Sequence, residues 1–188
     1  MNNFSRQKSI GDRSTPQCKQ ILANHWKINA NQILTADEWQ DKQLACDLVI
    51  PIGVIDNKDE IHVAQRTRIA ANFLDNPEYR IQFTIRSYHR NGKTELAKIL
   101  DGKADYILYG WENEDRTVTP WILGDLNIFR EVWPKIKDSV LNKSNGPYDN
   151  KFIAVPFHLL PLEFFTDHQG HEDPINENPN QWERLRYL

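Results

Sequence analysis

The feature that most constrains this chain is an apolar run at 44–54 containing one charged residue, Asp47. The run, LACDLVIPIGV, is rich in β-branched residues, which is typical of a strand buried on both faces. A turn-forming stretch follows at 56–59, and the segment 60–68 then alternates with the two-residue period of a strand. These two runs predict a β-hairpin. A carboxylate inside it must be solvated, paired or metal-bound, and a strand-end aspartate bonded to the backbone is the alternative to a functional role.

Further elements are predicted on both sides of the hairpin. Ser14, Thr15 and Pro16 form a start signal for a helix at 16–28. The other predicted elements are a helical turn at 37–39, helices at 95–101 and 126–141, and strands at 80–88, 104–111, 118–123 and 151–156. The order is therefore α-β-β-β-α-β-β-α-β, which predicts an α/β (mixed α+β) fold with a single central mixed sheet flanked by helices.

Local signals set the boundaries of the two later helices. Thr94 and Asp125 are predicted N-caps, and Gly102 is predicted to close the first of these helices. Pro134 lies within the apolar periodicity of the second, which predicts a kink or break near Val132.

The chain of 188 residues is expected to form one domain at 16–165. Residues 1–15 lack hydrophobic periodicity and are predicted to be a flexible N-terminal arm. Residues 166–188 are polar and predict an irregular, acidic C-terminal tail, in which His168 and His171 are too loosely held to favour a metal site.

Targeting and redox signals favour a cytoplasmic protein. The sequence offers neither an apolar run long enough to span a bilayer nor an apolar core for a secretory signal. Its two cysteines, Cys18 and Cys46, fit neither a disulfide framework nor a zinc motif.

The charge is distributed unevenly. A net charge of −3 argues against non-specific binding of nucleic acid by the whole surface. The stretch 61–103 nevertheless carries an excess of four positive charges, whereas 163–188 carries an excess of four negative charges. The middle of the chain can therefore face a polyanion, with random variation of surface charge as the alternative.

The element order between 16 and 111 resembles the core of the PD-(D/E)XK nuclease-like superfamily, which has a restriction-endonuclease-like fold. Such enzymes hold Mg²⁺ with two acids and place a cation near the scissile phosphate. Asp47 resembles the first metal ligand of that superfamily. The resemblance implies a magnesium-dependent nuclease acting on phosphodiesters.

The next strand departs from this pattern. Where the superfamily has acid-x-Lys, the sequence offers Gln65-x-Thr67 and Arg66-x-Arg68. The second acid must then come from Glu38 or Glu95, or catalysis has been lost. Arg66 and Arg68 are either phosphate-binding residues or part of a solvated edge face.

A second resemblance is carried by the segment 83–109. It is similar to a string found in uncharacterised proteins of bacteriophages and mobile elements. The matching residues are Phe83, Thr84, Ile85, Arg86, Gly92, Thr94, Glu95, Lys98, Ile99, Gly102, Asp105, Tyr106 and Tyr109. This resemblance implies an origin in phage or mobile DNA and a location in the cytoplasm of a bacterial host cell.

The candidate site residues follow from both resemblances and from the charge pattern. Asp47, Arg86, Glu95, Lys98 and Asp105 are expected to form one charged cluster, with a salt-bridge network between helix and sheet as the alternative. The predicted catalytic residues are Asp47, Glu95, Lys98 and Glu38. The predicted ligands of Mg²⁺ are Asp47, Glu95 and Asp105. The predicted nucleic-acid-binding residues are Arg66, Arg68, Arg86, Arg90 and Lys93.

Three functions remain open from the sequence. The first is a metal-dependent nuclease of phage or mobile-element origin. The second is a catalytically silent protein of the same fold that binds nucleic acid through the basic stretch. The third is a phage accessory or inhibitor protein that acts on a host or phage protein partner.

Overall fold

The computed structural model of the chain describes residues 3–51, 53–55, 60–70, 77–88, 93–144 and 151–171. Its α-helices are α1 (Asn3–Trp26), α2 (Glu38–Leu44), α4 (Glu95–Leu100) and α5 (Leu126–Ile136). Its strands are β1 (Leu34–Thr35), β2 (Leu48–Ile50), β3 (Ile61–Ile69), β4 (Gln82–Tyr88), β5 (Tyr106–Glu112), β6 (Val118–Asp125), β7 (Leu141–Ser144), β8 (Lys151–Pro156) and β9 (Phe165–Gln169). Its 3-10 helices are η1 (Ala30–Gln32), η2 (Pro77–Ile81), η3 (Phe157–Leu159) and η4 (Leu162–Phe164). The protein is therefore mixed α+β, as the sequence predicts.

The described strands form two sheets rather than the single sheet that was predicted. The central sheet has the order β1-β2-β3-β5-β6-β9 and is mixed, because β3 and β5 run parallel while its other pairs are antiparallel. The predicted hairpin is confirmed by the antiparallel pairing of Leu48 with Val63. The strand predicted at 80–88 instead becomes β4 of a second, antiparallel sheet with the order β4-β8-β7.

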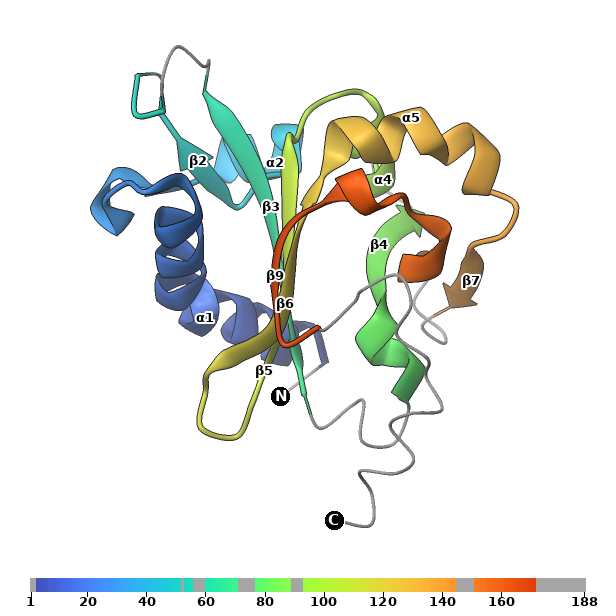
Figure 1. Cartoon of the computed structure of the whole chain (residues 1–188), viewed down its shortest axis with the longest axis horizontal. Helices are drawn as coiled ribbons and strands as arrows, with labels where there is room; N and C mark the ends of the chain where they lie inside the picture. The colour runs from blue at the N-terminus through green and yellow to red at the C-terminus, as the bar shows by residue number, and fades with distance from the viewer. Residues whose placement is uncertain are drawn as a thin grey trace.

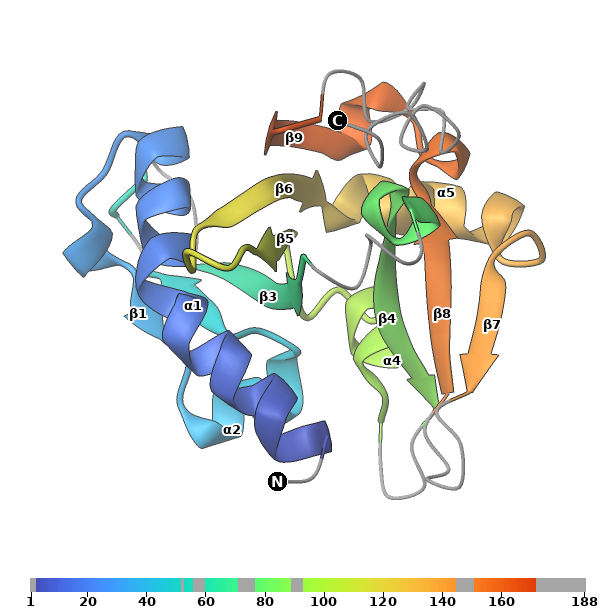
Figure 2. The same cartoon turned by 90° about the horizontal axis from the view of Figure 1, so that it is seen from below.

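Helix α1 covers one face of the central sheet, and α4, α5 and the second sheet lie on the other side, as Figures 1 and 2 show. Two apolar clusters fill these layers. One packs Leu22 of α1 against Leu48 and Val63, and the larger one brings Phe83 and Phe129 against the opposite face of the central sheet. The central strands are thus buried on both faces, which explains why the run at 44–54, which contains β2, is almost entirely apolar.

Helix α1 begins at Asn3, so residues 3–15 belong to the helix that was expected to start at residue 16. The hydroxyls of Ser14 and Thr15 each donate to the carbonyl of Gly11, at 3.0 Å, one turn earlier in the helix. They therefore bond backwards within a helix rather than capping a new one. Pro16 accordingly lies inside α1, and Ile10 is buried at 2% exposure.

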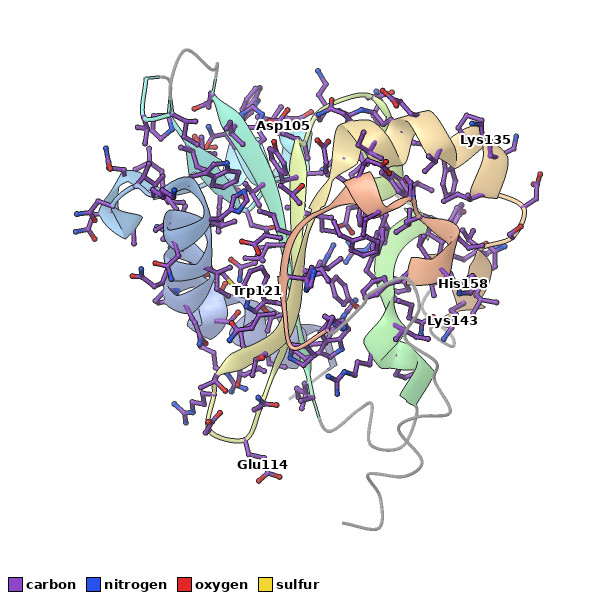
Figure 3. All side chains as sticks on the ribbon, in the orientation of Figure 1. Asp105, Glu114, Trp121, Lys135, Lys143 and His158 are labelled. Atoms are coloured by element: carbon purple, nitrogen blue, oxygen red, sulfur yellow. The ribbon has the colours of Figure 1, made fainter. Side chains whose placement is uncertain are left out.

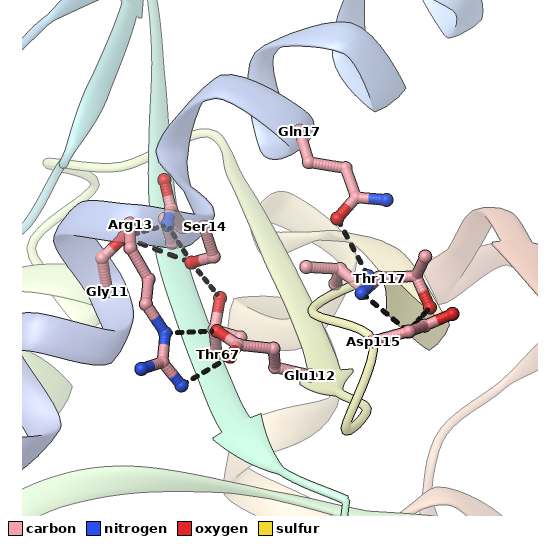
Figure 4. A network of polar contacts seen from close by, with 10 residues as sticks. Gly11, Arg13, Ser14, Gln17, Thr67, Glu112, Asp115 and Thr117 are labelled. Carbon is pink, nitrogen blue, oxygen red and sulfur yellow. Dashed lines mark hydrogen bonds and ion pairs between the residues drawn. The ribbon is translucent and has the colours of Figure 1, made fainter.

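Polar contacts hold this part of α1 on the sheet (Figure 4). Ser14 Oγ lies 2.8 Å from Thr67 Oγ1 and accepts from Gln65 Nε2 at 3.1 Å. Arg13 forms a two-point ion pair with the buried carboxylate of Glu112, in which Nε donates to Oε2 at 2.9 Å. Each contact joins residues about 50 or more positions apart, so none of them can be seen in a local pattern.

The predicted acidic tail also begins too early. Residues 165–169 form β9, which pairs with β6 at the edge of the central sheet. His171 is buried, with its ring against Trp111 and Phe157, so the packed domain extends past the predicted boundary at residue 165. His168 lies in β9 and is exposed. The residues after 171 lie outside the described ranges.

The helix boundaries that depend on local signals agree better with prediction. Thr94 accepts from the amide of Ala97 at 3.2 Å, Asp125 accepts from that of Asn127 at 2.7 Å, and Gly102 adopts a φ of +75°. Helix α5 continues through Pro134 without the predicted break but ends at Ile136, because the chain turns there into β7. Within the described residues, no helix is long and apolar enough to cross a membrane.

If α1 is an integral part of the domain, Ser14→Ala should lower the free energy of unfolding by about 1–2 kcal/mol, because Thr67 and Gln65 lose a buried partner. Urea denaturation measures this change. Gln20→Ala is the matched control, since Gln20 bonds only with Asn24 on the exposed side of the same helix among the contacts described. Equal stability of Ser14→Ala and the wild type would contradict the placement of α1.

Candidate functional site

Asp47 lies immediately before β2 and acts there as a backbone anchor. Its Oδ2 accepts from the amide of Gln65 at 2.6 Å. Its own amide donates to the carbonyl of Val63 at 3.0 Å, and its carbonyl accepts from Ala36 at 2.9 Å. The residue thereby joins β2 and β3 to the end of β1. Asp47 is thus a strand-end aspartate bonded to the backbone, which is the alternative to a functional role given above.

The alternation of β3 sends its polar residues to opposite faces of the central sheet. Gln65 and Thr67 point toward α1 and are buried at 8% and 6% exposure. They are one of the two residue pairs that stand where an acid-x-Lys pair is expected, and they bind the hydroxyl of Ser14. Arg66 and Arg68 point the other way, between the central sheet and β4. Because β3 is an inner strand, the alternative in which they lie on a solvated edge face is wrong.

Arg66 forms a two-point ion pair with Glu95, the first residue of α4. Its Nε donates to Oε1 at 3.0 Å, and its Nη2 donates to Oε2. The same Oε2 accepts from the backbone amide of Arg86 at 3.2 Å. The side chains of Arg66 and Glu95 are 30% and 11% exposed. The cluster therefore joins β3, β4 and α4 through a single carboxylate.

The charges of this cluster stabilise one another. Burial by itself would raise the pKa of Glu95, but the charge and hydrogen bonds of Arg66, followed by the amide and charge of Arg86, outweigh it and hold that pKa below its ordinary value. Burial likewise opposes the charged form of Arg66, yet the carboxylate of Glu95, with a further contribution from Asp47, raises the pKa of Arg66. Glu95 is thus an ionised carboxylate whose oxygens already accept hydrogen bonds.

Arg68 extends the polar layer toward the second sheet. Its Nη2 donates to Thr84 Oγ1 at 2.7 Å, and its Nε donates to the hydroxyl of Tyr109 at 3.3 Å. The hydroxyls of Thr84 and Tyr109 are themselves 3.2 Å apart. Thr84 and Tyr109 belong to the phage-like string, but sequence reasoning did not assign them to the site. Their role depends on the contact between the two sheets, which no local pattern encodes.

Asp105 does not join the cluster. Its Oδ2 accepts from the amide of His62 at 2.8 Å, at the start of β5 and away from the β5–β6 turn that carries Glu114 (Figure 3). Arg66 pairs with Tyr109 across the sheet, four residues further along β5. At about 3.3 Å per residue, Asp105 is roughly 13 Å from the Arg66 level, which is too far to share an ion with Glu95.

The described residues do not contain a group of three His, Cys, Asp or Glu side chains suited to a metal ion. The predicted set Asp47, Glu95 and Asp105 is therefore not brought together as Mg²⁺ ligands. Glu38 begins α2 and is exposed. Lys98 is partly buried on α4, which α2 contacts.

Of the remaining predicted nucleic-acid-binding residues, Arg86 lies on β4 of the second sheet. The guanidinium carbon of Arg86 is 6.0 Å from the centre of the Phe152 ring on β8. Lys93 donates to Asp101 at 2.7 Å, and both side chains are exposed. Arg90 lies outside the described residues.

The pH dependence of stability tests the Arg66–Glu95 pair. Glu95 has a lowered pKa when folded, so the wild type should lose stability as the pH falls through that pKa, below its ordinary value of 4.5. In Arg66→Met, burial should instead raise the pKa of Glu95, so the variant should gain stability as the pH falls from 7 toward 5. At pH 7 it should be about 2 kcal/mol less stable, between the values for buried and surface pairs. Urea denaturation from pH 7 to below pH 4.5 checks both slopes, and parallel curves for the wild type and the variant would contradict the pairing.

Comparison of the chain with protein-family models, with curated proteins and with solved structures found no match. The resemblances to nuclease-like and phage proteins therefore stay predictions.

Proposed function

We propose that this protein binds single-stranded nucleic acid on one face of the second sheet and does so without metal-dependent cleavage. The observation that carries the proposal is a row of side chains across that sheet. Arg86 on β4 lies opposite Phe152 on β8, which in turn lies opposite Lys143 on β7. Directly opposed residues of antiparallel strands share a face, so the row alternates cation, aromatic ring and cation.

Further aromatic residues accompany the cations of this sheet. The ammonium of Lys143 lies 4.4 Å from the centre of the Tyr79 ring. At one end of β4, Lys151 lies 5.5 Å from the ring of Tyr88, which is 44% exposed. Surfaces that bind single strands combine rings on which bases stack with cations that follow the phosphates. Lys151 precedes Phe152 on β8, so alternation directs it to the other face, at the end of the sheet. The Arg86–Phe152–Lys143 row together with Tyr79 provides both kinds of group within one small area.

The opposite face of this sheet is committed to the core. Ile85 and Ile153 are opposed on it, and Phe83 stacks on Phe164 at 5.6 Å while its ring meets Phe129 of α5. A ligand cannot enter that face without opening the core. The Arg86–Phe152–Lys143 row retains partial exposure, so it is the face available for binding.

The arrangement of acids favours binding over cleavage. A phosphodiesterase of the expected type needs two acids that hold Mg²⁺. Here Glu95 is bound by Arg66 and Asp47 by the amide of Gln65, so each acid already has a partner in the protein. The basic stretch 61–103 supplies Arg86 to the proposed surface, whereas its Arg66 and Arg68 hold the two layers together.

The variant Lys143→Gln tests the surface. We expect it to bind a fluorescent oligo(dT) several-fold more weakly than the wild type, with a salt dependence of log Kd that is smaller by about 1 because one phosphate contact is lost. Fluorescence anisotropy at several salt concentrations measures both quantities. Lys135→Gln is the matched control, with the same change of charge on the exposed side of α5.

Equal losses in Lys143→Gln and Lys135→Gln would refute the assigned surface, and an affinity that does not change with salt concentration would refute binding through phosphates. The same mixtures with Mg²⁺ or Mn²⁺ should leave the oligonucleotide intact. Cleavage that Asp47→Asn abolishes would establish the nuclease function instead.

A further inference from the structure

The Arg66–Glu95 pair has the geometry of an occupied oxyanion site. Two donors of one guanidinium meet the two carboxylate oxygens, and the amide of Arg86 adds a third donor at 3.2 Å. A planar guanidinium presents the same fork to two oxygens of a phosphate group. The protein thus already holds, in its interior, one anion in the arrangement in which arginine holds phosphate.

More positive charge converges here than a single carboxylate requires. The charge of Arg86 acts on Glu95 in addition to that of Arg66. Arg68 follows on the same face of β3 and donates to Thr84 of β4. The Arg66 side chain is 30% exposed, so the site is not sealed from solvent.

A second pair in the molecule provides a comparison. Arg13 binds Glu112 with the same two-point geometry, at the far end of the same sheet. There the described hydrogen bonds to the carboxylate come from Arg13 alone, and Glu112 is 3% exposed. Glu95 differs in taking donors from two arginines, one through its side chain and one through its amide.

We propose that Glu95 is an internal substitute for a phosphate group, and that the crossing of β3, β4 and α4 is a phosphate-binding site. Arg86 belongs both to this site, through its amide, and to the Arg86–Phe152–Lys143 row, through its guanidinium. A single strand lying on the row therefore places a terminal phosphate next to the site. The identification of a terminal phosphate rests on the proposed function, whereas the site itself does not.

The tethered carboxylate competes with any free anion at an effective concentration of millimolar or more. Removal of its charge should therefore increase phosphate affinity. We expect Glu95→Gln and Glu95→Ala to bind inorganic phosphate at least tenfold more tightly than the wild type, as measured by isothermal titration calorimetry at constant ionic strength. Glu112→Gln is the control and should show no gain. Folded Glu95 variants that bind phosphate no more tightly than the wild type would overturn the proposal.

Two oligonucleotides distinguish the sources of phosphate. A 5′-phosphorylated oligo(dT) should bind Glu95→Gln more tightly than its 5′-hydroxyl counterpart. Tighter binding of inorganic phosphate without this preference would show that the site takes a free anion and not a terminal phosphate. The proposed nucleic-acid surface would then be tested separately, by Lys143→Gln.

If the Glu95 variants do not fold, the phosphate-binding site can be tested on the wild type. Phosphate should then raise its melting temperature above that in chloride of equal ionic strength, and it should prefer the 5′-phosphorylated strand. The absence of both effects would overturn the site.

Discussion

The ion pair between Arg66 and Glu95 is the interaction on which the arrangement of the two sheets depends. Arg66 comes from the central sheet, Glu95 from α4, and the amide that completes the carboxylate's shell from β4 of the second sheet. Removing one partner would leave the other as a partly buried, uncompensated charge, which is costly in a protein interior. The pair therefore fixes the second sheet against the first, and with it the position of the Arg86–Phe152–Lys143 row.

The alternation of β3 makes this arrangement possible. Its even and odd positions serve two different layers: Gln65 and Thr67 bind α1, whereas Arg66 and Arg68 bind α4 and the second sheet. A shift of register by one residue would exchange these sets and place two arginines beneath a helix. The anchor that opposes such a shift is Asp47, whose side chain and amide both bond to β3.

What could be predicted from the sequence was local. The β2–β3 hairpin and the caps at Thr94 and Asp125 follow from residues a few positions apart, and all are present. The assignment of β4 to a second sheet could not be predicted, because its partner β8 lies about 70 residues further along the chain. Ser14 does not start a helix as its local pattern predicts, for a similar reason. Its hydroxyl contacts Thr67 on a strand far along the chain.

The candidate site likewise divides into residues whose meeting could be predicted from the sequence and residues whose meeting depends on long-range strand pairing. The sequence predicts Arg86 and Glu95 in one charged cluster, and they do meet, through the amide of Arg86. It does not place Arg66 there, although Arg66 is the residue that binds the carboxylate of Glu95. It also placed Asp105 there, although alternation and register carry Asp105 to the amide of His62 instead. Phe152 and Lys143 could not be found from the sequence, because their relation to Arg86 exists only in the register of β4, β8 and β7.

Photo-cross-linking can locate the side chains against which the bases of a bound strand lie. An oligonucleotide that contains 5-bromouridine cross-links to aromatic side chains with which its bases are in contact, and mass spectrometry identifies them. If nucleic acid binds on the second sheet, cross-links should form at Phe152 and Tyr79. Trp39 on α2 is 64% exposed and serves as an internal control. Cross-linking at Trp39 with none on the second sheet would refute the proposed surface.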